Sequence, residues 1–317
     1  GTEASHMHSR DDLGCGRGYE GWLLTEATRR NPKIRTFGLS WGVPGWVGEG
    51  EFFSTDNIHY QVQWVECMKT AYNVSIDLIG IWNERQYGPI DYTIKLRQAL
   101  DAAGHTQTKI VLPDGFVSDS LVKQLNSNKS FNDAVYALGT HSCSAAPTWK
   151  GDSNSFSQKW WCTELEVHNG WVGGASWAEY LSTNFVRSNQ TSTTSWSLIW
   201  STPIALVPYQ NCGAMMAHEP WSGHYTVDAA IWMHAHWTQF TEIGWKMLTV
   251  ESEGSGFLPD GSGTYVTIVS PDGKDFSIVM ERLANSTSMR YQLHLEGLDT
   301  SKPLRLWKTS ESAYFQQ

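Results

Sequence analysis

Apolar positions along residues 17–200 alternate between two spacings. In some segments they recur every three or four residues, as on one helix face, and in others they form short continuous runs, as in a buried strand. The first spacing predicts helices near residues 16–30, 57–72, 90–104, 118–126 and 176–188. The short runs predict strands at residues 33–40, 76–82, 109–114, 134–141, 159–164 and 194–200. Strands that alternate with helices indicate βαβ units and an α/β fold with parallel pairing.

The helical spacing also predicts which face of a helix is apolar. The expected apolar faces are Tyr19, Trp22, Leu23 and Ala27 in the first helix, and Ile58, Val62, Val65 and Met68 in the second. Asn31 and Pro32 stop the first helix, and Gly104 closes the third.

Six strands precede Pro203, whereas a closed (β/α)8 TIM barrel has eight. We therefore expect two further βα units upstream of Gly1, and assign residues 1–235 to the barrel portion of a catalytic domain. Beyond residue 240 the pattern becomes all-β: residues 263–283 read as two strands around a Pro-Asp-Gly turn, and residues 291–298 and 302–309 as two short strands. Residues 236–317 are accordingly expected to form part of a β-sandwich.

Composition narrows the function classes. The 317 residues carry a formal net charge of -9 and no cluster of Lys and Arg, which argues against a nucleic-acid partner. No apolar run is long enough to predict a transmembrane segment. The five cysteines include no CxxC pair, so we expect no metal site, and their odd number leaves at least one thiol. Four Asn-x-Ser/Thr sequons favour a secreted or lysosomal glycoprotein.

Two of the predicted strands end in a carboxylate. Glu84 follows the run at 76–82, and Glu164 ends the run at 159–164. A parallel barrel delivers the C-terminal ends of all its strands to one face. With two strands upstream, the runs at 76–82 and 159–164 are the fourth and seventh strands, so Glu84 and Glu164 can face each other there. Glu166 competes with Glu164 for the second position, and Glu164 is preferred because the apolar run stops at it.

A pair of carboxyl groups about 5–5.5 Å apart is what a retaining glycosidase needs, one as acid and the other as nucleophile. The 17 Trp residues add flat apolar faces on which sugar rings can stack. The sequence thus predicts a retaining glycoside hydrolase that requires no cofactor.

Several segments resemble the galactosylceramidase (galactocerebrosidase) family over nearly the whole chain. They are IGIWNER, LSWGVPGW, GTEASHMH, RGYEGWL, AHEPWSGHY and HWTQFTEIGW. The resemblance implies a (β/α)8 barrel with a β-sandwich and a lectin-like domain, lysosomal in animals, which releases galactose from glycolipids with retention. It implies that Glu84 is the acid/base and Glu164 the nucleophile, that Asn83 contacts the sugar, and that Trp41, Trp196 and Tyr209 line the sugar pocket.

The resemblance also has departures. Family members carry a disulfide from a position near Ser176 to the β module, and this chain has no matching cysteines there. Arg290 is only a weak substitute for a substrate-contacting Arg of that module.

The resemblance makes a galactosylceramide-like glycolipid the expected substrate and a lipid-presenting activator protein a candidate partner. Two other functions stay open: a related β-glucosidase of the glucosylceramidase type, and a non-catalytic glycan-binding fragment. Retention of both Glu84 and Glu164 disfavours a pure binder, which needs neither carboxylate. The HxH pair of His234 and His236 is interpreted as packing, since no third ligand is apparent in the sequence.

Overall fold

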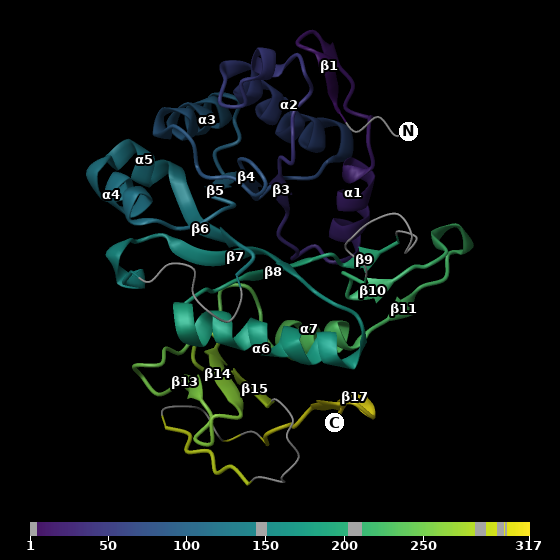
Figure 1. The fold of residues 1–317 in the computed structure, drawn as a ribbon, viewed down its shortest axis with the longest axis vertical. Helices are drawn as coiled ribbons and strands as arrows, with labels where there is room; N and C mark the ends of the chain where they lie inside the picture. The colour runs from purple at the N-terminus through teal and green to yellow at the C-terminus, as the bar shows by residue number, and fades with distance from the viewer. Residues whose placement is uncertain (1–4, 144–150, 202–210, 283–289, 297–300, 302) are drawn as a thin grey trace. The chain divides into compact units, whose positions relative to one another are not determined.

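The computed structural model describes residues 5–143, 151–201, 211–282, 290–296, 301 and 303–317 (Figure 1). The chain divides into two compact units, Gly1–His141 with Trp149–Trp161, and Ser142–Thr148 with Cys162–Gln317. The expected domain division at residue 235 stays a prediction. Within the described ranges, no helix is both long and apolar enough to cross a bilayer.

The first unit contains parallel strands separated by helices. Its elements are β1 (Met7–Ser9), β2 (Asp12–Leu13), α1 (Glu20–Arg30), β3 (Phe37–Leu39), η1 (Val47–Gly50), α2 (Thr55–Tyr72), β4 (Leu78–Gly80), α3 (Ile90–Ala102), β5 (Lys109–Val111), α4 (Asp119–Ser127), α5 (Lys129–Ala134), β6 (Val135–His141) and η2 (Ser153–Ser155). Strand β3 pairs with β4, β4 with β5 and β5 with β6, all in parallel. The α/β class with parallel pairing is therefore confirmed.

Helix α2 shows how the sequence specifies this unit. Its first turn is capped by Ser54, whose Oγ accepts a hydrogen bond from the Asn57 amide, and it ends at Asn73 in the left-handed conformation. The predicted apolar face is buried in one core with β4, β5 and α3. Helix α1 differs, because Tyr19, Trp22 and Leu23 are exposed among the described residues. Its buried residue is Gly21, which has no Cβ and so leaves room for the ring of Tyr72.

Strand β7 (Lys159–Glu166) begins in the first unit and ends in the second. The other elements of the second unit are α6 (Gly170–Ser188), β8 (Thr193–Trp196), β9 (Ile199–Trp200), β10 (Met215–Met216), η3 (Pro220–Ser222), β11 (Thr226–Val227), α7 (Ala229–Thr238), β12 (Lys246–Met247), β13 (Ser255–Phe257), β14 (Gly263–Val269), β15 (Phe276–Arg282), β16 (Lys308–Ser310) and β17 (Ala313–Gln316). Strands β7 and β8 are parallel.

The predicted strand at 159–164 is longer than expected, because Glu166 still pairs with Trp196 of β8. The predicted strand at 194–200 is two strands, and the second, β9, pairs with β10 in a separate small sheet. The hairpin at 263–283 is confirmed as β14 and β15, joined by the Pro-Asp-Gly turn with Gly273 at φ +71.

The prediction of a strand at 291–298 is wrong over its described residues 291–296, which lie in no strand. Of the described residues 303–309, those that form a strand belong to β16, which pairs with β17. The described β residues thus form a four-stranded sheet of β12 to β15 and a two-stranded hairpin, and the β-sandwich stays a prediction.

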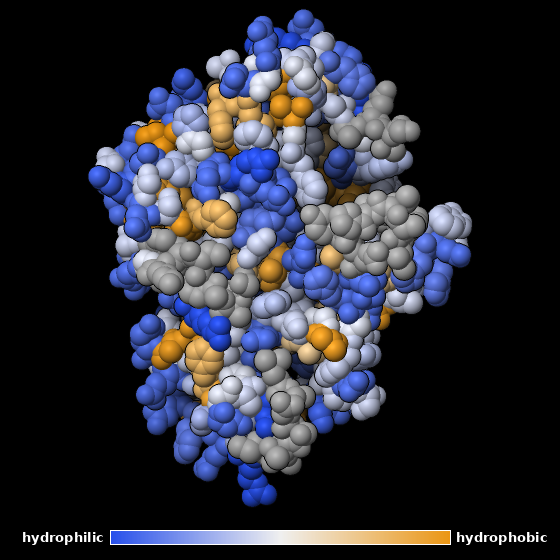
Figure 2. All heavy atoms as spheres, viewed as in Figure 1, coloured by the Kyte–Doolittle hydropathy of each residue, from blue (hydrophilic) through white to orange (hydrophobic). Residues whose placement is uncertain are grey.

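Two disulfides and close helix packing stabilise the structure. Cys15 is joined to Cys67 in the first unit and Cys143 to Cys162 in the second. Cys212 is the expected remaining thiol. In the second unit α6 packs closely on α7, where Gly174 leaves room for Ala229. On the face shown in Figure 2, polar residues predominate and apolar residues surface in small separate groups.

Candidate active site

Glu84 lies in the turn that follows β4, at the C-terminal end of that strand. Its backbone has φ +54, in the left-handed region that non-glycine residues seldom adopt. The turn is fixed by the Glu84 amide, which donates a 2.8 Å hydrogen bond to Oδ2 of Asp114. A strained backbone held by a buried partner is typical of functional positions, and the Glu84 side chain is 58% exposed.

Asp114, His141 and Glu84 form a connected chain of polar groups. Nδ1 of His141 lies 3.1 Å from Oδ2 of Asp114, and Nε2 lies 3.4 Å from Oε1 of Glu84. The side chains of Asp114 and His141 are 4% and 14% exposed. With the Nδ1 hydrogen donated to Asp114, Nε2 can accept a hydrogen bond from a protonated Glu84 carboxyl group or, when it carries a proton, donate one to the Glu84 carboxylate. The imidazole therefore orients the carboxyl group of Glu84.

The sequence analysis did not single out Asp114 and His141. Glu84 was predicted because it is a polar residue at the C-terminal end of a strand. Asp114, which closely follows β5, and His141, the last residue of β6, have the same position. The signal was thus available in the polar residues that end the predicted strands at 109–114 and 134–141.

The residues beside Glu84 form a firm support for the turn. The ring of Trp82 stacks on Phe52, with centroids 3.8 Å apart and an interplanar angle of 7°. The guanidinium of Arg85 lies 5.5 Å over the Trp82 ring and donates to the Glu84 carbonyl at 2.9 Å. The Asn83 amide donates to the Ser40 carbonyl at 2.9 Å.

The side-chain oxygen of Asn83 is buried, and no described residue satisfies it. A buried polar atom without a partner costs about 1–3 kcal/mol, so a substrate hydroxyl that donates to it would recover that cost. The expected contact of Asn83 with a sugar stays a prediction.

Trp41 lines a cavity of about 550 Å³ beside the C-terminal end of β3. The Trp41 side chain is 60% exposed, and the wall includes Leu39, Trp64 and Tyr60. Gly38 allows this wall, because a Cβ there would meet the Trp64 ring at 2.6 Å. The cavity thus offers aromatic faces of the type expected for a sugar pocket.

In the second unit, Glu164 lies within β7 and is half-buried. Its carbonyl accepts a 2.8 Å hydrogen bond from the Ser142 amide, next to the Cys143–Cys162 disulfide. Trp196 ends β8, and its ring lies 5.2 Å from that of Trp200 at 69°. Tyr209, the remaining predicted sugar contact, lies outside the described residues.

The structure thus brings Asp114 and His141 to Glu84 within the first unit. Glu164 belongs to the second unit, and its pairing with Glu84 at the distance of a retaining enzyme stays a prediction. The choice between Glu164 and Glu166 also remains open, because β7 continues through both residues.

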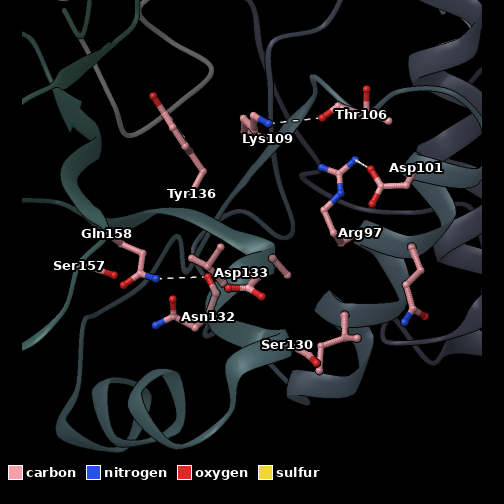
Figure 3. Close-up of a pocket in the computed structure, with 14 residues that line it drawn as sticks. Arg97, Asp101, Thr106, Lys109, Ser130, Asn132, Asp133, Tyr136, Ser157 and Gln158 are labelled. Atoms are coloured by element: carbon pink, nitrogen blue, oxygen red, sulfur yellow. Dashed lines mark hydrogen bonds and ion pairs between the residues drawn. The ribbon is translucent and has the colours of Figure 1, made fainter.

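A second cavity in the first unit, of about 580 Å³, is polar (Figure 3). It lies at the N-terminal ends of β5 and β6, the opposite strand ends from Asp114 and His141. Arg97 donates to Asp101 at 2.7 Å, and Gln158 donates to the carbonyl of Asn132 at 3.3 Å. Its polar groups thus bond largely to one another, and it contains none of the predicted site residues.

Two solved structures that resemble this one are SrfJ from Salmonella typhimurium and the family 30 subfamily 8 xylanase Xyn30A from Clostridium acetobutylicum. The TM-scores are 0.56 and 0.54, at 13% and 12% identity. The first match covers 87% of this chain and 75% of the other chain, and the second covers 80% and 69%. At this identity the likeness shows the fold alone, an α/β fold shared with these two structures.

The sequence profile of glycosyl hydrolase family 59 matches residues 1–239, and the chain belongs to that family. Galactocerebrosidase of Danio rerio is 38% identical over 98% of this chain, and that of Homo sapiens is 37% identical over 91%. A putative galactocerebrosidase of Caenorhabditis elegans is 29% identical over 91%. These matches cover 46%, 41% and 43% of the relatives, so the chain spans less than half of their length.

Proposed function

We propose that the protein is a retaining glycoside hydrolase that releases β-linked galactose from galactosylceramide-type glycolipids. The observation that carries the proposal is the strained turn at Glu84, where a partly exposed carboxyl group is oriented by the buried pair of His141 and Asp114. Membership of glycosyl hydrolase family 59 and the galactocerebrosidase names of the relatives support the substrate.

The proposed reaction is a double displacement. Glu84, as a carboxylic acid, gives its proton to the glycosidic oxygen while the Glu164 carboxylate attacks the anomeric carbon from the opposite face. The bond to the ceramide oxygen breaks, the lipid alcohol leaves, and a galactosyl ester of Glu164 forms. Glu84, now a carboxylate, takes a proton from water as the water oxygen attacks the anomeric carbon, which releases galactose and the Glu164 carboxylate.

His141 and Asp114 act through Glu84 in this mechanism and are positioning residues. The imidazole accepts or donates a hydrogen bond at Oε1 of Glu84 in the two protonation states that the acid/base must adopt. Because the Asp114 carboxylate holds both His141 and the Glu84 amide, it fixes the side chain and the turn together.

Asn83, Trp41, Trp196 and Tyr209 are the proposed sugar contacts. Stacking on Trp41 would contribute roughly 0.5–1.5 kcal/mol beyond the buried area, taking aromatic pairs as the guide. The axial 4-hydroxyl of galactose requires a hydrogen-bonding partner, since a polar site rejects an isomer that leaves its groups unpaired.

We also propose a partner protein and a cellular compartment for the reaction. A glycolipid with a buried acyl chain needs to be presented to a water-filled site, which favours a lipid-presenting activator protein as partner. Lysosomal or secreted localisation is consistent with the sequons and with the two disulfides, which form in oxidising compartments.

Azide rescue tests the roles of the two carboxylates in the full-length protein. In Glu164→Gly, azide can occupy the vacated space and attack an activated aryl β-galactoside, so the expected product is the α-galactosyl azide. In Glu84→Gly, the galactosyl enzyme still forms from an activated substrate and azide attacks it from the other face, so the expected product is the β-azide. Absence of rescue, or the same azide from both variants, would contradict the assignment.

Glu166→Gly is the matched control, two residues along the same strand. It should retain activity and give no α-azide, and an α-azide from this variant would move the nucleophile to Glu166. The hydrolysis rates of aryl β-galactosides and aryl β-glucosides show which sugar the enzyme prefers. Equal turnover of the two would refute galactose specificity, and faster turnover of glucosides would support the glucosylceramidase-type alternative.

A further inference from the structure

Glu166, His168 and Cys212 form a cluster in the second unit. Nδ1 of His168 lies 3.8 Å from Sγ of Cys212, and Nε2 lies 3.7 Å from Oε2 of Glu166. One potential ligand atom of each residue lies within 4.8 Å of the others. Cys212 is buried, whereas the side chains of Glu166 and His168 are 46% and 53% exposed.

Backbone hydrogen bonds hold the two segments that carry these side chains together. The Asn169 amide donates to the Asn211 carbonyl at 3.0 Å, one residue beyond His168 and one before Cys212. The Cys212 carbonyl accepts hydrogen bonds from the amide and the hydroxyl of Ser197, at 3.2 and 2.9 Å. The positions of the three side chains are therefore set by the fold and do not depend on a ligand to assemble them.

We propose that Glu166, His168 and Cys212 bind one divalent cation of the Zn²⁺ class. Thiolate, imidazole and carboxylate are the three ligand types that Zn²⁺ takes in proteins. Three protein ligands leave a fourth, water-filled position, and the exposed side of the cluster gives a cation access to it.

The spacing fits the size of a tetrahedral site. With Zn–S about 2.3 Å and Zn–N about 2.0 Å, a sulfur and a nitrogen on one zinc ion lie about 3.5 Å apart. The observed 3.8 Å between Cys212 and His168 therefore needs only a few tenths of an ångström of contraction. Glu166 can rotate to complete the site because its carboxylate is at the surface. Ca²⁺ and Mg²⁺ require all-oxygen ligands and are not expected to compete.

A hydrogen-bonded chain and a nucleophilic Cys-His pair are the two alternatives to a cation site. In the hydrogen-bonded chain, His168 bridges the thiol and the carboxylate and no cation binds. In the nucleophilic pair, the Cys212 thiol would be activated. Cys212 is instead buried, and a buried thiol is inert towards a substrate, which disfavours such a pair.

Cobalt titration of the metal-stripped protein tests the site with a readout independent of activity. We expect one Co²⁺ per chain and a near-ultraviolet thiolate-to-cobalt charge-transfer band, which one equivalent of Zn²⁺ removes and excess Ca²⁺ or Mg²⁺ does not. His168→Gln should weaken Co²⁺ binding by at least about 100-fold, since even outer-shell partners contribute about 10–100-fold. Cys212→Ser should abolish the band.

His224→Gln, which removes an exposed histidine outside the cluster, is the matched control and should bind Co²⁺ as the wild type does. If Cys212→Ser does not fold, as judged by circular dichroism, His168→Gln and Glu166→Gln decide the question, because their side chains are half-exposed. Absence of the band in the wild type, its persistence in Cys212→Ser, or unchanged affinity in both exposed-ligand variants would overturn the proposal.

Discussion

His234 gives the second unit a stability that depends on pH. It lies on α7 with its ring 5.2 Å from that of Trp177, and burial lowers its pKa from 6.5 to about 4. The native state thus binds a proton less readily than the unfolded chain. The stability that the neutral ring contributes is present above pH 6.5 and is lost as the pH falls towards 4.

The magnitude follows from linkage. The difference between 6.5 and about 4, at about 1.4 kcal/mol for each pH unit, amounts to about 3 kcal/mol in the acid limit. Between pH 7.5 and pH 5, about 2 kcal/mol of that stability should be lost. A His234→Phe variant keeps an aromatic ring against Trp177 and does not titrate, so its unfolding free energy should fall by about 2 kcal/mol less over this interval.

Urea unfolding at pH 7.5 and pH 5, followed by circular dichroism, measures the loss of unfolding free energy between the two pH values in the wild type and in His234→Phe. Comparing each protein with itself cancels any packing change caused by the larger ring. His224→Phe, at an exposed position, should keep the pH dependence of the wild type. If His234→Phe and the wild type lose the same stability between pH 7.5 and pH 5, the reasoning is refuted.

Three further predictions concern the first unit. Replacing Cys15 and Cys67 together by Ala should cost about 4 kcal/mol of unfolding free energy, since the disulfide spans 52 residues, and urea denaturation under oxidising conditions measures the loss. Glu84→Gly should raise the free energy of unfolding by about 1 kcal/mol because glycine tolerates φ +54, whereas Glu84→Ala should not raise it. Equal stability of the two variants would contradict strain at this turn. His141→Ala should lower kcat by about 100-fold with little change in KM, and more on poor leaving groups than on activated aryl galactosides; a loss equal for all leaving groups would argue against its positioning of the acid.

Much of the first unit could be predicted because its apolar runs are continuous and helices α2, α4 and α5 begin at capping Ser or Asn side chains. The Ile58 to Met68 stripe of α2 is buried as expected, and the strand before Glu84 forms where the apolar run predicts it. The face of α1 with Trp22 and Leu23 was predicted equally clearly and is exposed among the described residues. Periodicity shows which residues share a face, but what covers that face depends on elements that periodicity does not identify.

Pairing between distant segments was the part that the sequence could not supply. The residues 291–296 alternate in polarity, yet they form no strand, because a strand also needs a partner with free backbone groups. Strand β7 extends to Glu166 through its register with Trp196, which no apolar run reveals. The contact of His141 with Glu84 likewise depends on which strands are neighbours, and so does the cluster around Cys212.

Among the described strands, β3 pairs on one side only, with β4. An unpaired strand edge presents amide and carbonyl groups that a strand of another molecule can use. We therefore expect a purified sample of this chain to associate through Phe37–Leu39 as its concentration rises. For crystallisation or storage, dilute conditions or a lysine at an edge position would be the practical remedies, and light scattering against concentration would show which is needed.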